Sequence, residues 1–139
     1  MGVKYLLDTN ILSELSKEEP DPNVLASLNK YGDHCATAAL VIHEINYGIQ
    51  RLPEGKLKAN LQIFLQQLEV YEFQVLPYDK AAAHYHASER ARLAAKGLTP
   101  SFVDGQIAAI SATNNLILVT RNTKDFENFS EISLENWFV

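Results

Sequence analysis

The sequence is poor in cysteine, in excess positive charge and in long apolar runs. Its single cysteine, Cys35, excludes a disulfide within the chain and fits a reducing compartment such as the cytosol. Asp and Glu outnumber Lys and Arg by 17 to 12, and the formal net charge of -5 argues against a protein that grips nucleic acid through bulk positive charge. A nuclease is not excluded, because metal cations in a carboxylate-rich site can neutralise phosphate.

No apolar run is long enough to span a membrane. The first run, Val3 to Leu7, stops at Asp8 and is too short even for a signal peptide, and no later stretch approaches the roughly 18 apolar residues of a membrane helix. We therefore expect a cytoplasmic protein with no membrane partner. The chain has 139 residues of ordinary composition, 47% hydrophobic and 21% charged, which suits one domain over residues 1–139.

Short apolar segments alternate with helical patterns along the chain. Strands are expected at about residues 3–7, 34–37, 73–76, 116–119 and 131–133, and helices at about 11–16, 22–30, 39–51, 54–69, 80–96 and 101–114. In the fourth helix we expect an apolar stripe to face the core, made of Leu57, Leu61, Phe64, Leu65 and Leu68. The alternation predicts an α/β fold with a mainly parallel central sheet.

Acidic and amide side chains follow the expected strands or begin the expected helices. Asp8 ends the first strand, Glu44 lies in the helix after the second strand, and Asp104 lies in the first turn of a later helix. Asn122 and Asp125 follow the strand at 116–119. Strand carboxyl ends and helix N-termini meet at one edge of a parallel sheet, where α/β proteins bind ligands, so these side chains are able to gather there.

Gathered acids of this kind would require a cation. Mg²⁺ prefers oxygen ligands, and clustered carboxylates without a cation would repel one another and partly protonate. Glu44 precedes Ile45 and is therefore expected to border the core face of its helix. Each acid also has a simpler interpretation, as helix cap (Asp8), surface charge (Glu44), helix-dipole partner (Asp104) or loop residue (Asp125). The spacing alone leaves both interpretations open.

Four segments carry a more specific pattern. They are residues 5–15 (YLLDTNILSEL), 43–49 (HEINYGI), 103–109 (VDGQIAA) and 118–126 (LVTRNTKDF), followed by ENW at 135–137. With these segments the chain resembles the PIN-domain ribonucleases, and most of all the VapC and FitB-like toxins of bacterial type II toxin–antitoxin pairs. The resemblance implies a three-layer α/β/α sandwich and an endoribonuclease that uses Mg²⁺ or Mn²⁺ to activate the water that attacks an RNA phosphodiester. It also implies a homodimer and a cognate antitoxin that fills an apolar groove and blocks the acidic site.

The resemblance also assigns roles to residues. Asp8, Glu44 and Asp104 fall on the family's three acidic positions, with Asp8 and Asp104 as the most direct metal ligands. The fourth acidic position often follows Thr-Arg, and here that place holds Asn122. Either Asn122 or Asp125, three residues further on, would supply this function.

Two interpretations near this fourth position remain open. Arg121 is a candidate contact for RNA phosphate, and a solvated surface role is the alternative. The departure from the pattern at Asn122 also permits a different function, a weakly or non-catalytic PIN module that acts by binding nucleic acid or an antitoxin.

Overall fold

Five short strands form the central sheet of the computed structural model, which describes residues 2–139. The strands are Tyr5–Leu7 (β1), Cys35–Ala38 (β2), Gln74–Leu76 (β3), Ile117–Val119 (β4) and Ser133–Glu135 (β5). The α-helices are Thr9–Leu15 (α1), Pro22–Tyr31 (α2), Ala39–Gln50 (α3), Lys56–Val70 (α4), Lys80–Ala95 (α5) and Phe102–Thr113 (α6). Two 3₁₀ turns, Gly32–His34 (η1) and Thr123–Asp125 (η2), precede β2 and follow β4.

The sheet is parallel throughout, with the strand order β3-β2-β1-β4-β5. β1 lies between β2 and β4, so the chain connections run from it to both halves of the sheet. The position where the strand order changes direction in this way is called the switch point, and ligands bind there in α/β folds. Leu7 pairs with Thr37 on one side and with Val119 on the other. Asp8 and Thr120, the residues that follow Leu7 and Val119, are consequently neighbours at the carboxyl edge.

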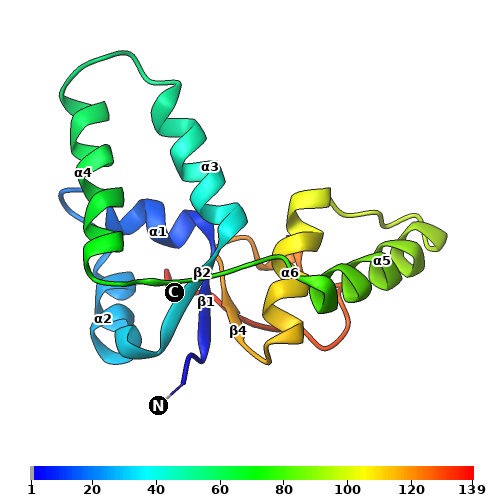
Figure 1. Cartoon of the computed structure of the whole chain (residues 1–139). Coiled ribbons are helices and arrows are strands. Elements are labelled where there is room, and N and C mark those ends of the chain that lie inside the picture. Colours follow the sequence, from blue (N-terminus) through cyan, green and yellow to red (C-terminus); the bar gives the residue numbers. More distant parts are fainter. Residues whose placement is uncertain (1) are drawn as a thin grey trace.

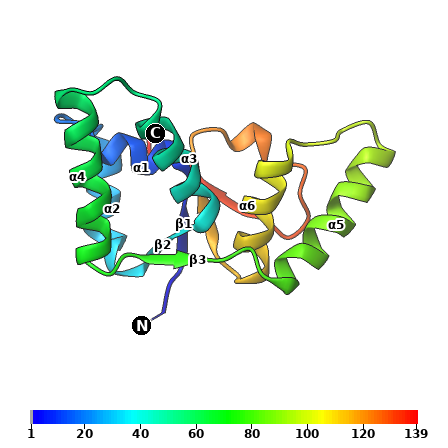
Figure 2. The same cartoon turned by 45° about the horizontal axis from the view of Figure 1, so that its top comes forward.

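The helices cover both faces of this sheet, which confirms the predicted three-layer α/β/α sandwich. Figures 1 and 2 show α1, α2 and α4 on one side and α5 and α6 on the other. β1 is buried on both faces, as its unbroken apolar sequence predicted. Among the described residues, no helix is both long enough and apolar enough to cross a membrane.

The predicted helix ends are largely confirmed. Asp21 caps α2 by accepting from the backbone N–H groups of Asn23 and Val24, and Asp79 caps α5. Gly97, expected to end α5, has a φ of 71°, a left-handed conformation that favours glycine. The last strand was misplaced: β5 begins at Ser133, where the prediction had the strand end.

The prediction that the apolar stripe of α4 faces the core was wrong. Leu57 is 62% exposed, and none of the residues of α4 is fully buried. The other four members of the stripe, Leu61, Phe64, Leu65 and Leu68, are only half-buried, because α4 lies beside α3 at the side of the molecule (Figures 1 and 2). Helical periodicity shows that one face is apolar, but it does not show whether that face meets the protein's own core.

Helices α5 and α6 pack tightly against each other at Gly105. A Cβ atom added there would overlap the imidazole of His86, which is buried on α5. That ring cannot easily move, because its Nδ1 is 2.9 Å from the hydroxyl of Tyr78 and its centroid is 4.7 Å from that of Phe102. Glycine is therefore needed at position 105 for the helices to pack.

We predict that Gly105→Ala lowers the free energy of unfolding by about 1–3 kcal/mol through overpacking. The matched control is Gly48→Ala on α3, where an added Cβ meets no atom within 4 Å and helix propensity favours alanine. Urea unfolding of both variants measures the difference. Equal stabilities for the two variants would show that the α5–α6 contact is looser than described.

Candidate active site at the carboxyl edge of the sheet

Asp8 forms the centre of the candidate site. It follows β1, and its side chain is only 6% exposed. Its Oδ1 accepts a hydrogen bond from the backbone N–H of Thr9 at 2.8 Å, as a helix cap does, and its Oδ2 accepts one from the hydroxyl of Thr120 at 2.8 Å. Asp8 is therefore a cap for α1, and both its oxygens are held in place at the switch point.

Thr120 is a site residue that the sequence analysis missed. It is fully buried, and its hydroxyl oxygen accepts from Asn10 Nδ2 at 3.3 Å and from the backbone N–H of Asn122 at 3.1 Å. Asn10 Oδ1 in turn accepts from the backbone N–H of Arg121 at 3.0 Å. These bonds join the segments that follow β1 and β4. The available signal was a polar residue directly after a buried strand, in line with Asp8.

Glu44 reaches the site from α3. Its Oε2 accepts a hydrogen bond from the hydroxyl of Thr9 at 2.9 Å, so Thr9 links the second acid to the first. The side chain of Glu44 is exposed, and the expectation that it borders the core was wrong; Ile45, its neighbour, is the one that packs against the core. An exposed carboxylate beside a buried one is open to a ligand from solvent.

Asp104 and Asp125 are the other two acids of the candidate site. The hydroxyl of Ser101 caps α6 by accepting from the backbone N–H of Asp104 at 3.1 Å. Asp125 is exposed at the end of η2. Both acids line one cavity of about 390 Å³, together with Ser101 and Asn128.

Burial raises the pKa of the Asp8 carboxyl, and the nearby charges of Glu44 and Asp125 add to this effect. The hydrogen bonds from Thr9 and Thr120 lower that pKa without reversing the direction. Partial burial likewise raises the pKa of Asp104, to which Asp125, Asp8 and Glu44 contribute in that order. The neighbouring acids thus lie near enough to disfavour the ionised forms of Asp8 and Asp104.

Asn122 and Arg121 are less closely joined to the acids. Asn122 is exposed, and its backbone N–H, not its amide side chain, bonds to Thr120. The guanidinium of Arg121 lies over the ring of Phe138, 4.1 Å from its centroid. Of the two candidates for the fourth position, Asp125 is the one whose charge acts on both Asp8 and Asp104.

A divalent cation fits the chemistry of this donor set. The candidate ligands are carboxylate oxygens, which suit Mg²⁺ and Mn²⁺, and among the described residues no ion pair neutralises any of the four acids. Across residues 2–139, no three side chains of His, Cys, Asp or Glu already converge as a finished metal site. Like charges repel, so these carboxylates would draw together only around a cation.

A parallel sheet of this order, with acids at the carboxyl edge of its central strand, defines the class of protein. Residues 5–132 match the sequence model of the PIN domain, and the chain therefore belongs to the PIN-domain family. The matched range includes Asp8, Glu44, Asp104 and Asn122.

Individual relatives agree along nearly the full length. The chain is 33% identical to VapC ribonuclease Y4jK of Sinorhizobium fredii, over 88% of this chain and 89% of that protein. It is 31% identical to the tRNA(fMet)-specific endonuclease VapC of Shigella flexneri, over 97% and 98%. Its structure resembles that of VapBC2 from Rickettsia felis bound to a DNA fragment from their promoter, with a TM-score of 0.82, 27% identity and coverage of 99% of both chains.

Proposed function

We propose that this chain is a Mg²⁺- or Mn²⁺-dependent endoribonuclease that acts as the toxin of a type II toxin–antitoxin pair. One observation carries the proposal: Asp8, buried at the switch point of the sheet, lies within electrostatic range of Glu44, Asp104 and Asp125, and none of the four acids forms an ion pair with a cationic side chain of the described residues. Relatives whose names include ribonuclease and endonuclease support the same reaction class. A cytoplasmic location is part of the same proposal, because the proposed substrate is cellular RNA.

Asp8 and Asp104 would hold the cation most directly, with Glu44 and either Asp125 or Asn122 completing the site. A bound divalent cation lowers the pKa of water and stabilises charge on a phosphoryl oxygen. The chain's own contribution is positioning: Thr120 and Thr9 fix the Asp8 carboxylate, and the Thr9 hydroxyl also orients Glu44. A carboxylate fixed in this way needs little rearrangement when the substrate arrives.

The partners proposed for the chain are RNA, a cognate antitoxin and a second copy of itself. A cavity of about 260 Å³ runs from Thr9 and Glu44 to the apolar side chains of α3 and α4, including Ile45 and Phe64. An antitoxin segment lying in this groove would cover Glu44. The exposed apolar residues nearby, which are Tyr47, Leu57, Ile63 and Val70, leave further surface for protein contacts.

The decisive experiment incubates the purified chain with tRNA, including initiator tRNA, in Mg²⁺ or in EDTA, and maps the ends of any fragments. We expect endonucleolytic cleavage in Mg²⁺ or Mn²⁺, none in EDTA, and recovery when the cation is restored. Induction of the chain in growing bacteria should arrest growth under the same assignment. Cleavage that persists in EDTA would contradict metal dependence.

The departure at Asn122 sustains a second candidate function, a weakly or non-catalytic binding module. Under that assignment the folded chain would bind RNA or an antitoxin, but it would cleave no class of RNA in the presence of Mg²⁺ or Mn²⁺. Gel-shift measurements beside the cleavage assay therefore separate the two functions.

A further inference from the structure

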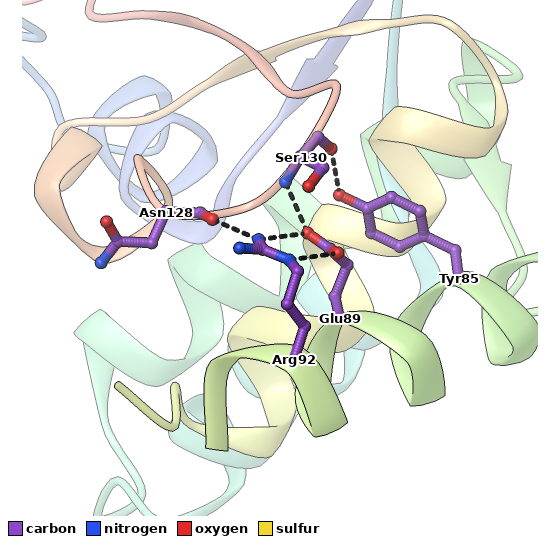
Figure 3. Close-up of polar contacts among 5 residues, drawn as sticks. All are labelled: Tyr85, Glu89, Arg92, Asn128 and Ser130. Atoms are coloured by element: carbon purple, nitrogen blue, oxygen red, sulfur yellow. Dashed lines mark hydrogen bonds and ion pairs between the residues drawn. The ribbon is translucent and has the colours of Figure 1, made fainter. Parts of the chain in front are cut away.

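A polar cluster on α5 joins this helix to the segment that follows Asp125. The cluster, called the clamp below, consists of Tyr85, Glu89 and Arg92 with the backbone of Asn128 and Ser130 (Figure 3). Within it, the guanidinium of Arg92 makes two hydrogen bonds to the carboxylate of Glu89, Nε to Oε2 at 2.9 Å and Nη2 to Oε1 at 2.8 Å. Such paired contacts restrict orientation more than a single contact does.

The clamp holds the backbone of the segment at two places. Arg92 Nη2 donates to the carbonyl oxygen of Asn128 at 2.7 Å. At Ser130, the backbone N–H donates to Glu89, and the carbonyl oxygen accepts from the hydroxyl of Tyr85. Three side chains of one helix therefore fix both backbone groups of Ser130 and the carbonyl of Asn128 (Figure 3).

Glu89 is buried, with 7% of its surface exposed, which is unusual for a carboxylate outside the site. Burial of an ionised group is costly unless charge and hydrogen bonds compensate. Here the guanidinium of Arg92, followed by the groups of Ser130, lowers the pKa of Glu89 to about 2. Glu89 is therefore ionised and fully engaged near neutral pH, so the clamp is a rigid device and not a pH switch.

The segment held in this way carries part of the proposed active site. Asp125 lies three residues before Asn128, and both line the cavity that Asp104 also lines. η2 is only three residues long, and a turn of that length does not hold its own position. The buried rings of Phe126 and Phe129 anchor the segment to the core, and the clamp fixes its backbone at Asn128, between the two rings, and at Ser130, directly after them.

We propose that Glu89 and Arg92 are positioning residues, whose ion pair holds segment 125–130 against α5 and so keeps Asp125 beside Asp104. The proposal rests on the proposed function, because Asp125 matters to chemistry only if the acids hold a cation. Neither Glu89 nor Arg92 touches the acids of the site, and both act through the backbone of segment 125–130. The alternative is that Phe126 and Phe129 suffice, and that the clamp contributes only to stability.

The test is Glu89→Gln in the full chain, with Mn²⁺ binding followed by electron paramagnetic resonance of the free ion. Loss of a residue that orients a ligand typically weakens metal binding about 10- to 100-fold, so we expect the Mn²⁺ dissociation constant to rise at least about tenfold. The Mn²⁺ concentration that gives half-maximal RNA cleavage should rise in parallel, while KM for RNA stays unchanged. Tyr85→Phe, which removes one hydroxyl, should give a smaller shift in the same direction.

The matched control is Glu54→Gln, which removes an ion pair of similar length, 2.9 Å to Lys58, at the start of α4. It should leave Mn²⁺ binding unchanged. Wild-type Mn²⁺ affinity in folded Glu89→Gln and in Tyr85→Phe would overturn the proposal; if Glu89→Gln does not fold, Tyr85→Phe decides alone. Asp8→Asn in the same assay separates a failure of this proposal from a failure of the proposed function. Wild-type Mn²⁺ binding and RNA cleavage in Asp8→Asn would overturn the proposed function itself.

Discussion

Asp8→Asn should abolish RNA cleavage and at the same time make the metal-free protein more stable at neutral pH. The loss of activity is expected because the substitution removes the charge of the most buried acid while preserving its shape. Several kcal/mol of electrostatic stabilisation of the transition state are at stake, and about 4 kcal/mol corresponds to about a 10³-fold slower rate. Fragment analysis of tRNA in Mg²⁺ measures this loss.

The gain in stability follows from the raised pKa of Asp8. A carboxyl whose pKa is higher in the folded state than in the unfolded state stabilises the fold below the unfolded value, about 3.9, and this contribution is lost as the pH rises through the folded value. At pH 7 the ionised Asp8 therefore destabilises the metal-free protein. Asparagine removes the cost of burying the charge, which is the largest cause of the raised pKa, and gives up one of the two hydrogen bonds that the carboxylate accepts, which is a smaller cause. Thermal unfolding in EDTA should show a higher Tm for the variant at pH 7, and the advantage should disappear toward pH 4.

Added Mg²⁺ should reverse the order of the two proteins. A ligand that binds only the folded state raises its stability by mass action, so Mg²⁺ should raise the Tm of the wild type and have little effect on Asp8→Asn. The control is Asp33→Asn, which alters an exposed acid in η1 at the opposite end of β2. A variant that is less stable than the wild type in EDTA at pH 7 would contradict the account of Asp8 as a destabilising charge.

Much of the fold could be predicted because its signals are local. The strands at β1 and β4 are unbroken apolar runs, and the ends of α2, α5 and α6 carry capping residues next to them in the sequence. β5 was displaced because it is a short, half-buried edge strand, and the apolar–polar alternation over residues 132–135 spans too few residues to fix its ends. The apolar face of α4 was assigned to the core because periodicity does not distinguish a core from a surface left for a partner.

The site could be predicted only in part, since its contacts are distant in the sequence. Asp8, Glu44 and Asp104 were found as acids at the right ends of elements, and the structure brings them within electrostatic range of one another. Thr120 was missed because its bond to Asp8 joins residues 112 positions apart. The clamp was missed for the same reason, because Glu89 and Arg92 look like an ordinary surface pair on a helix until Ser130 is placed beside them.

The fourth acidic position gives the second large effect that we expect. Asp125→Asn should reduce cleavage about 10- to 100-fold, the range for groups that support a metal site, and should raise the Mg²⁺ concentration needed for activity. Asn122→Ala should have a much smaller effect, because the bond of Asn122 to Thr120 comes from its backbone and survives the substitution. Initial rates of tRNA cleavage across a Mg²⁺ series measure both variants.

The double variant Asn122→Asp, Asp125→Asn determines whether position or charge matters. In the family an acid often follows Thr-Arg, and this chain has its nearest acid three residues later, across the single turn η2. If the site needs a negative charge near Asp8 and accepts it from either position 122 or position 125, the double variant should recover much of the activity lost in Asp125→Asn. If the clamp has fixed the geometry for Asp125 alone, the double variant should remain as inactive as Asp125→Asn. A larger loss in Asn122→Ala than in Asp125→Asn would contradict the assignment of Asp125 and return the fourth role to the amide of Asn122.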